Sequence, residues 1–484
     1  MRVPQRLITV EGRALKEPKV VYKGNDAARL QSGSWNMLEV KFNSAGMRLK
    51  KWSYLFVSTT GTPDAFSSEP SLAAVMNELH MALEATGGLA DKPARGKRIV
   101  VSDANDPIID DTLKLAAGNF DLLFIILPTA SHPLYPQIKR LGDVQYGIQT
   151  ICSVGERIAK EKGRDQYLKN LALKFNLKLG GTNQIVDSLR LSIINEDKTM
   201  VVGIDVTHPS PGSSANAPSI AGMVANIDKS LGQWPATIRI QSRARKEEAD
   251  NLTEMLKRHL DLWKTKGKHQ SFPENILVYR DGVSEGQYDK VIDEELPQLR
   301  LACKDRYPLT DQNMNLPRFT IIIVGKRHHT RFYPTAEKTA DRYSNPKPGT
   351  VVDRGVTQAQ NWDLFLQPHA ALQGTARPAH YYVLLDEIFG HRYKSIPSPF
   401  KNIADVLEDL IHGMSYAYGR ATKAVSVCPP AKYADMVCER ARCYLSSLFE
   451  TPTHSIGTGS QGEASAGNDD VLVHEKLRDT MFYI

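Results

Sequence analysis

The feature that most constrains the fold is a series of strand-length apolar runs separated by longer stretches of helical character. In the second part of the chain the helical stretches are 248–266 and 403–421. Strands that alternate with helices are typical of an α/β domain, so we predict one here with a sheet of mixed order. The predicted strands of this part are 199–205, 237–243, 275–281, 318–325 and 380–387.

The first part of the chain shows the same alternation over a shorter length. A helical stretch at 71–85 precedes apolar runs at 97–103 and 120–128. A further helix within 163–183 is stopped by a pair of glycines, which is a common helix end, so we place a domain boundary there. The predicted organisation is an arm at 1–40, an α/β domain at 41–182, a second at 183–484, and a mobile Gly/Ser-rich surface loop at 453–469.

The net charge of +7 belongs entirely to the first part of the chain. Residues 1–182 hold 25 Lys and Arg against 18 Asp and Glu, a surplus of 7, whereas residues 183–484 hold 36 against 36. A local surplus of this kind fits a polyanionic partner that binds at one end. The sequence has no apolar run long enough to span a membrane, no signal-peptide core and no CxxC pattern among its five cysteines. We therefore expect reduced thiols, a cytoplasmic location and no membrane insertion.

Two of the predicted strands end on a carboxylate. The run VVGID ends at Asp205, and NILVYRD ends at Asp281. Strand ends gather at one edge of an α/β sheet, where ligands commonly bind. Two carboxylates held close together repel unless a cation lies between them, and Mg²⁺ takes oxygen ligands of this kind. The alternative from the residues alone is that each Asp caps the turn that follows it.

Several longer motifs resemble a known family. VVGIDVTHPSPG, YRDGVSEGQY, VGKRHHTRF, GTARPAHYYVLLDE and LRDTMFYI are similar to the PIWI domain of eukaryotic Argonaute proteins. LYPQIKRLGD and LALKFNLKLGGTN resemble the MID domain of the same proteins, and fungal Argonautes of the quelling type are similar in these motifs. The resemblance implies a Rossmann-like MID domain at 41–182, an RNase H-like PIWI domain at 183–484, and a preceding linker at 1–40.

The resemblance also implies a catalytic set for RNA cleavage. Asp205 and Asp281 match the first two metal-ligand positions of the family, and Asp435 stands where some members have His. Glu247 matches the fourth acidic position, with Glu248 as the competing choice, although acidic residues also stabilise a helix N-terminus without any catalytic role. The implied enzyme is a Mg²⁺-dependent endoribonuclease with two ions, for which Mn²⁺ can substitute, and its products carry a 3′-hydroxyl and a 5′-phosphate.

A second set of residues is implied to hold a guide strand. Tyr135 and Lys139 are four residues apart, as are Lys174 and Lys178, so each pair shares one face of a predicted helix. A solvated basic face is the alternative, and the resemblance favours a 5′-phosphate pocket instead, in which Tyr135 stacks on the first base. The further positions implied for the pocket are Thr150 and Arg440, and those for the guide backbone are Lys326, His329, Arg331, Arg377, Arg420 and Ser426.

Three positions of these sets carry particular expectations. Ile151 stands where the family often has Gln, so either Thr150 supplies the missing polar contact or the pocket has one contact fewer. Arg440 follows Asp435 by five residues in one predicted helix, about 140° round its axis, so one helix can serve both sites. The family's Tyr near the start of that helix is Lys432 here, which puts its contact in doubt.

The resemblance implies partners as well. They are a guide small RNA, a complementary target RNA and Trp-containing silencing proteins, with the protein itself a monomer. Two functions remain open on the sequence: a guided endoribonuclease, and a guide-binding repressor that acts through partner proteins without cutting. The presence of Asp205, Asp281 and Asp435 favours the first.

Overall fold

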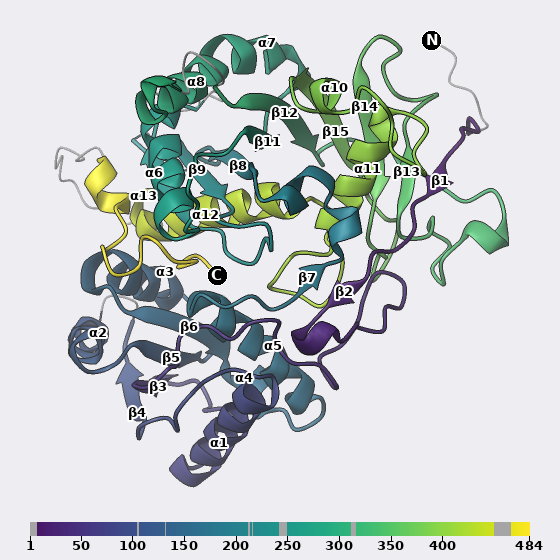
Figure 1. The fold of residues 1–484 in the computed structure, drawn as a ribbon. Coiled ribbons are helices and arrows are strands. Elements are labelled where there is room, and N and C mark those ends of the chain that lie inside the picture. Colours follow the sequence, from purple (N-terminus) through teal and green to yellow (C-terminus); the bar gives the residue numbers. More distant parts are fainter. Residues whose placement is uncertain are drawn as a thin grey trace.

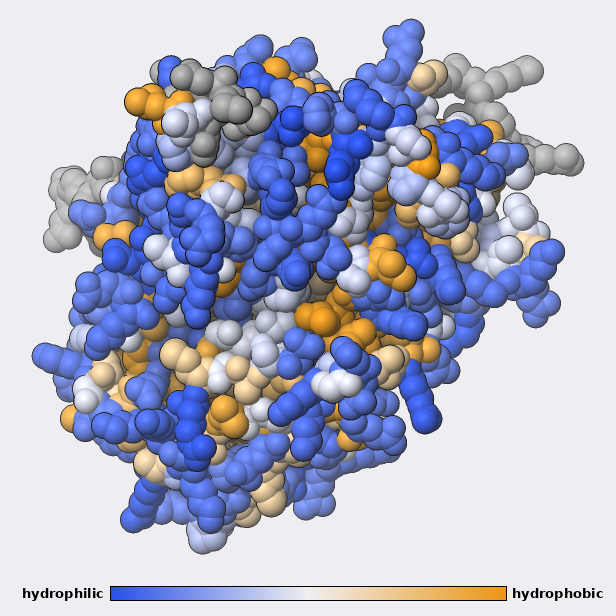
Figure 2. Space-filling view, viewed as in Figure 1, coloured by the Kyte–Doolittle hydropathy of each residue, from blue (hydrophilic) through white to orange (hydrophobic). Residues whose placement is uncertain are grey.

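The described part of the computed structural model contains two large sheets, each covered by helices, and a two-stranded sheet, with the N-terminal segment running along both large sheets (Figure 1). Hydrophilic residues cover most of the face seen in Figure 2, and apolar side chains gather there in small groups. No helix in the described part of the chain is long and apolar enough to cross a membrane. The structure describes residues 7–103, 106–130, 132–211, 213–214, 216–241, 249–310, 316–449 and 466–484.

The smaller sheet is parallel throughout and has the strand order β4-β3-β5-β6. Every residue of its central strand β5 (Leu122–Leu127, LLFIIL) is buried, as expected for a parallel strand with helices on both faces. The predicted runs at 97–103 and 120–128 and the predicted helix at 71–85 are therefore confirmed. The remaining elements are β3 (Trp52–Thr59), β4 (Lys97–Val101), β6 (Gln149–Val154), α1 (Glu69–Ala85), α2 (Pro107–Asn119), α3 (Leu134–Arg140), α4 (Gly155–Ala159) and α5 (Arg164–Lys178).

The larger sheet has nine strands in the order β1-β13-β14-β15-β12-β11-β8-β9-β10. Its centre, β8-β11-β12, is parallel, and the strands on either side pair antiparallel, which confirms the predicted mixed order. The strands are β1 (Arg13–Ala14), β8 (Thr199–Thr207), β9 (Ile220–Ala225), β10 (Ala236–Ile240), β11 (Asn275–Asp281), β12 (Arg318–Gly325), β13 (Thr350–Val352), β14 (Trp362–Gln367) and β15 (Ala379–Asp386).

Helices cover the two faces of the larger sheet, and the strand alternation decides which side chain meets which helix. Met200, Val202 and Ile204 of β8 pack with α6 (Leu252–Thr265) and α8 (Leu296–Arg306). Val201 packs in the core that contains α11 and α12. Asp205 is an odd-numbered residue of the same strand, so its side chain lies on the α12 face. The remaining helices are α7 (Tyr288–Lys290), α10 (Phe389–Arg392), α11 (Ile403–Met414), α12 (Pro429–Tyr444) and α13 (Ser446–Phe449).

Helix α12 lies unusually close to the strands beneath it. A Cβ atom added to Gly203 of β8 would stand 2.0 Å from the carbonyl oxygen of Pro430. A Cβ added to Gly222 of β9 would stand 3.0 Å from Cys438 Sγ. The absence of side chains at these two positions allows α12 to rest directly on the strands, and it brings Asp435 over the end of β8.

The structure corrects several predicted boundaries. Strand β8 continues to Thr207, so Asp205 lies inside it rather than at its end, because β9 continues to pair with it, Asp205 opposite Gly222. Helix α11 stops at Met414 rather than near 421. Within the predicted loop at 453–469, residues 453–465 lie outside the described part, and a 3-10 turn begins at Asn468.

The predicted arm is partly built into the fold. Its β1 forms one edge of the nine-stranded sheet by pairing with β13, and β2 (Val20–Val21) pairs with β7 (Ile185–Val186). These pairings join the arm to segments more than 150 residues away, which local apolar pattern does not predict. The domain boundary near 182 stays a prediction.

Candidate functional site

Asp205 and Asp281 stand level on neighbouring strands. Ile204 of β8 pairs with Arg280 of β11 in parallel register, so the residue after each comes to the same height and points to the same face. Oδ1 of Asp205 lies 3.1 Å from where a Cβ would stand on Gly282, the residue after Asp281. The two carboxylates that the sequence predicts at neighbouring strand ends are therefore brought together.

The environment of this pair disfavours its negative charge. Burial raises the pKa of the Asp205 carboxyl, and the charge of Asp435 raises it further. Burial raises the pKa of the Asp281 carboxyl to about 7, with Asp205 as the next cause. Two carboxylates held close together repel each other, and burial adds to the cost of their charge.

A buried cation supports the pair from the opposite face. Arg280 points away from α12 and forms a buried ion pair with Glu295, Nη2 to Oε1 at 2.9 Å. Its Nη1 also donates to the main-chain oxygen of Asp281. Glu295 in turn accepts from the main-chain N–H of Ala249 at 2.8 Å. Arg280 lowers the pKa of both Asp205 and Asp281, although less than burial raises it.

Asp435 reaches this edge from α12. Its charge acts on Asp205 and on Asp281, which places all three carboxylates in one region. Its Oδ2 forms an ion pair with Lys432 Nζ at 2.6 Å, one helical turn earlier. The remaining predicted acid, Glu247, and its competitor Glu248 lie outside the described residues.

The donor set at the edge fits a divalent cation. Carboxylate oxygens are the ligands that Mg²⁺ and Mn²⁺ prefer, and two buried like-charged carboxylates are stabilised by a cation between them. Among residues 7–484 outside the undescribed gaps, no group of three or more His, Cys, Asp or Glu is arranged to hold a metal. Asp205 and Asp281 would thus be the core of such a site, and Asp435 would have to share its carboxylate with Lys432.

The residues of the predicted phosphate pocket come together between α3, α5 and β6. Lys139 Nζ donates to the main-chain oxygen and to Oγ1 of Thr150, at 2.9 and 2.8 Å. Lys178 Nζ donates to Gln149 Oε1 at 3.2 Å and to the main-chain oxygen of Phe482. Thr150 is thus bonded to Lys139, and its replacement of the family's Gln contact stays a prediction. The pocket also uses Gln149, which the sequence reasoning missed.

Positive charge is crowded in this pocket. Burial lowers the pKa of Lys174 to about 7, and the nearby Arg420 and Lys139 lower it as well. Burial likewise lowers the pKa of Lys178 well below its usual value. Lys139 stands 5.4 Å from the centre of the Tyr135 ring. Tyr135, Lys139, Lys174 and Lys178 therefore converge as predicted, with too few anions to balance them.

Arg440 enters the pocket from α12. Its Nη1 forms a buried ion pair with Asp143 Oδ2 at 2.6 Å, and its Nη2 donates to the Tyr135 hydroxyl at 3.5 Å. The same guanidinium donates to the main-chain oxygens of Phe482 and Tyr483, at 2.8 and 3.0 Å. One helix thus carries Asp435 to the acidic edge and Arg440 to the basic pocket, as its spacing predicts. Asp143 was missed, and its charge between apolar neighbours in LGDV was the available signal.

A row of cations connects the two sites. Arg420 lies close enough to Lys174 to lower its pKa, and its charge also acts on Lys432. Lys326 in turn feels the charges of Lys432 and Arg377, and its pKa is lowered mainly by burial. Ser426 accepts a hydrogen bond from Lys326. The row therefore consists of five cations from distant segments, each close enough to the next for their charges to interact: Lys174, Arg420, Lys432, Lys326 and Arg377.

The other two residues predicted to contact the guide backbone, Arg331 and His329, lie on one loop. Nη1 of Arg331 donates to the main-chain oxygens of His328 and Thr330, at 3.1 and 2.7 Å, so it is engaged with its own loop. His329 is exposed on that loop. Within the described residues, no hydrogen bond or ion pair joins either of them to the row of cations.

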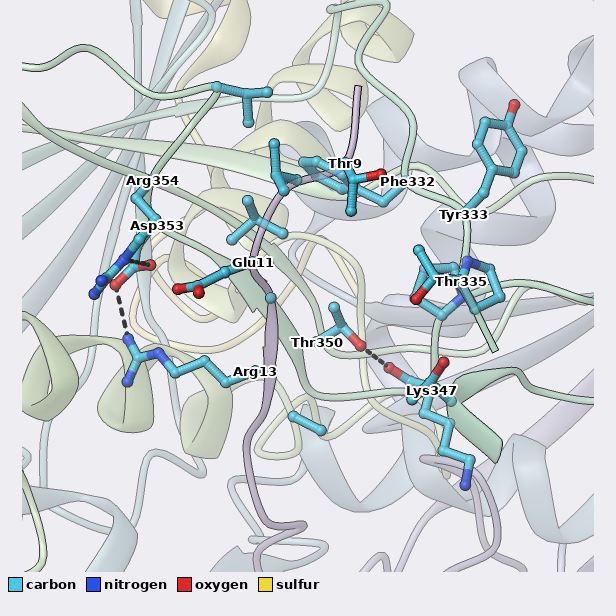
Figure 3. A pocket seen from close by; sticks show the side chains of 18 of the residues that line it. Thr9, Glu11, Arg13, Phe332, Tyr333, Thr335, Lys347, Thr350, Asp353 and Arg354 are labelled. Atoms are coloured by element: carbon cyan, nitrogen blue, oxygen red, sulfur yellow. Dashed lines mark hydrogen bonds and ion pairs between the residues drawn. The ribbon is translucent and has the colours of Figure 1, made fainter. Parts of the chain in front are cut away.

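A large cavity lies apart from both groups of predicted site residues. It has a volume of about 1160 Å³ between the N-terminal segment and the loops around β13. Figure 3 shows Arg13 of β1 pointing toward Asp353 on its wall, with which it forms an ion pair of 2.9 Å. Of all the predicted site residues, only Arg331 lines this cavity.

Comparison with known proteins identifies the fold. The Piwi domain family model matches residues 122–446. The chain is 32% identical to Protein argonaute 1B of Oryza sativa subsp. japonica, over 96% of this chain and 41% of that protein. It is 31% identical to Protein argonaute 5 of Arabidopsis thaliana, over 100% and 48%. The chain therefore spans less than half the length of these relatives.

Solved structures agree with this result. The C-terminal lobe of a budding yeast Argonaute superposes with a TM-score of 0.82 at 26% identity, covering 98% of this chain and 95% of that one. The MID-PIWI domains of the N. crassa QDE-2 Argonaute superpose with a TM-score of 0.66 at 30% identity, covering 92% and 100%. The fold is thus a Rossmann-like MID sheet followed by an RNase H-like PIWI sheet, and the chain belongs to the Piwi-domain family of Argonaute proteins.

Proposed function

We propose that the chain is the guide-binding and cleaving half of a small-RNA-guided silencing effector. The observation that carries the proposal is the pair of oppositely charged clusters at α12, one of lysines around Arg440 and one of carboxylates around Asp435, joined by a row of cations. A nucleic-acid strand has the charge to neutralise the first cluster and to follow the row. Kluyveromyces polysporus Argonaute, whose structure contains a guide RNA, superposes with a TM-score of 0.84 at 25% identity.

In this proposal the basic pocket holds the 5′-phosphate of the guide. Lys139, Lys174 and Lys178 supply charge-assisted hydrogen bonds, as does Arg440, and Thr150 keeps Lys139 in place. Tyr135 offers its ring to the first base. The proposed contacts along the guide backbone are those of Lys326, His329, Arg331, Arg377, Arg420 and Ser426.

The acidic edge is proposed to cleave a complementary target RNA. Two divalent ions, when bound, would supply an activated water and stabilise the leaving oxygen. Asp205, Asp281 and Asp435, whose charges act on one another, would hold these ions. Glu247 would orient the water. Water attacks the phosphorus, the bond to the 3′-oxygen breaks, and that oxygen takes up a proton, which leaves a 3′-hydroxyl and a 5′-phosphate.

A specific observation favours the alternative of a guide-binding repressor that does not cut. Asp435 is paired with Lys432 rather than directed at Asp205 and Asp281 alone. Such a repressor would act through partner proteins, for which Trp-containing silencing proteins are the candidates. For the cleaving effector of the main proposal, we propose a monomer that acts in the cytoplasm. Its cofactor is Mg²⁺, for which Mn²⁺ can substitute.

Cleavage of a matched RNA separates the two functions. The protein loaded with a 5′-phosphorylated guide should cut its target opposite the guide centre in Mg²⁺. Asp281→Ala should reduce the rate on the order of a thousandfold, because it removes charge stabilisation of the transition state, and should leave guide binding intact. Asp289→Ala, an exposed acid shortly after the same strand, is the matched control. If the unmutated, guide-loaded protein leaves the target RNA uncut, the function is that of a guide-binding repressor and not of an endoribonuclease.

A further inference from the structure

Lys432 is the only basic residue that the structure places in an ion pair with a carboxylate of the acidic edge on the α12 face, within the described residues. Its Nζ lies 2.6 Å from Asp435 Oδ2, and the two side chains are 42% and 38% exposed. An exposed ion pair one helical turn apart is usually a minor surface feature. The surroundings of this pair set it apart from that case.

Two opposing sets of charges meet at the Lys432 ammonium. On one side are the carboxylates of Asp435 and, beyond it, Asp205 and Asp281, which Asp435 repels. On the other side are Arg420 and Lys326, both close enough for their charges to interact with Lys432. Lys432 is therefore the point at which the row of cations touches the acids.

We infer that Lys432 is a built-in counter-ion that occupies Asp435 in the guide-free protein and weakens divalent-metal binding until an RNA phosphate draws it away. The inference rests on the proposed function, because it takes the acidic edge as a metal site and the row of cations as a phosphate path. It adds a positioning residue and a direct link between occupancy of one site and readiness of the other.

The direction of the effect follows from the charges. A lysine ammonium competes with a metal ion for Asp435 and repels it, and its removal leaves three carboxylates with one cation fewer. A phosphate placed on the row of cations offers Lys432 an alternative anion with several acceptor oxygens. The long, flexible lysine side chain can exchange one anion for the other without movement of α12.

Metal affinity without guide is the decisive measurement. Mn²⁺ is titrated into the guide-free protein and its binding followed by electron paramagnetic resonance. Lys432→Met should bind Mn²⁺ about threefold more tightly than the unmutated protein, a factor in keeping with a half-exposed ion pair. Lys432→Arg, which keeps the charge, should resemble the unmutated protein. Loading a 5′-phosphorylated guide should shrink the difference.

A matched control removes the same charge at the opposite end of the strands. Lys198 precedes β8 and forms an exposed ion pair of 2.7 Å with Glu274, so Lys198→Met changes net charge and ion pairing equally. It should leave Mn²⁺ affinity unchanged. Equal affinities in Lys432→Met and the unmutated protein would overturn this inference alone, as would weaker binding in the variant. Absence of Mn²⁺ binding to the unmutated, guide-loaded protein would overturn the proposed chemistry as well.

Discussion

The basic pocket and the acidic edge are electrostatic opposites built to a similar plan. In the pocket, burial and neighbouring cations lower the pKa of Lys174 to about 7. At the edge, burial and a neighbouring carboxylate raise the pKa of Asp281 to about 7. Each site holds more charge of one sign than its surroundings balance. Each is therefore prepared for an ion of the opposite sign, a phosphate in one case and a divalent cation in the other.

The two regions differ in how many of their charged side chains are held in place by other groups of the protein. In the pocket, Arg440 is fixed by Asp143 and by the main chain at Phe482 and Tyr483, and Lys139 is fixed by Thr150. At the edge, the supporting ion pair of Arg280 lies behind the strands, and Asp435 is shared with Lys432. The difference suggests a pocket formed before ligand binds and an edge that is completed by it.

Removal of two pocket lysines is the strongest test of this comparison. Lys139→Ala with Lys174→Ala should weaken binding of a 5′-phosphorylated guide on the order of a hundredfold, because each charge-assisted contact contributes about 1.5 kcal/mol. A guide with a 5′-hydroxyl should lose much less. The measurement is a filter-binding titration of both guides, with Lys160→Ala and Lys162→Ala as a control on the surface of the same domain. Equal losses for the two guides would refute the pocket.

The pH dependence of guide binding should be smaller but specific. Lys174 must be protonated to bind phosphate, and with a pKa of about 7 in the guide-free protein it loses that proton as the pH rises. Affinity for a 5′-phosphorylated guide should therefore be full below pH 7 and fall by up to about tenfold per pH unit above it. The terminal phosphate is already mostly a dianion there, since its second pKa is near 6.

The titrating group can be verified by substitution. Lys174→Met should flatten the pH profile while lowering affinity at pH 6.5. A 5′-hydroxyl guide should show a nearly flat profile with the unmutated protein. A profile that stays steep in Lys174→Met would assign the dependence to another group.

The smallest expected effect concerns stability at the acidic edge. The folded pKa of Asp281, about 7, lies above the usual value of an unfolded Asp. The folded protein therefore binds more protons between these values, and its free energy of unfolding falls as the pH rises through this window. In EDTA at pH 8, Asp281→Asn should be more stable by about 1 kcal/mol, a figure reduced for the partial exposure of the side chain.

Metal should reverse the order of the two proteins. Millimolar Mn²⁺ should stabilise the unmutated protein through its binding to the folded state and should have little effect on Asp281→Asn. Denaturant titrations with and without Mn²⁺ measure both differences. If Asp281→Asn is less stable in EDTA at pH 8, the carboxylate pair does not carry the unfavourable charge described above.

Much of the fold was predictable because the apolar pattern is local. The runs at 275–281 and 318–325 became β11 and β12 with the predicted bounds. Other strands were missed, among them β6, β9 and β14, since their apolar runs are short and interrupted by polar or small residues. The extension of β8 past Asp205 was also missed, because it depends on pairing with β9 rather than on its own residues.

The candidate sites divide in the same way. The sequence alone determined which residues carry the charge, that Asp281 ends a strand, and that Asp435 and Arg440 leave one helix in different directions, because periodicity along a strand or helix is set locally. Only the tertiary structure decided that Asp205 and Asp281 stand at the same height on neighbouring strands. It also decided that Arg440 forms an ion pair with Asp143 and that Lys432 forms one with Asp435. Arg440 and Asp143 are 297 residues apart, and such contacts follow from how helices and sheets pack, which no local pattern records.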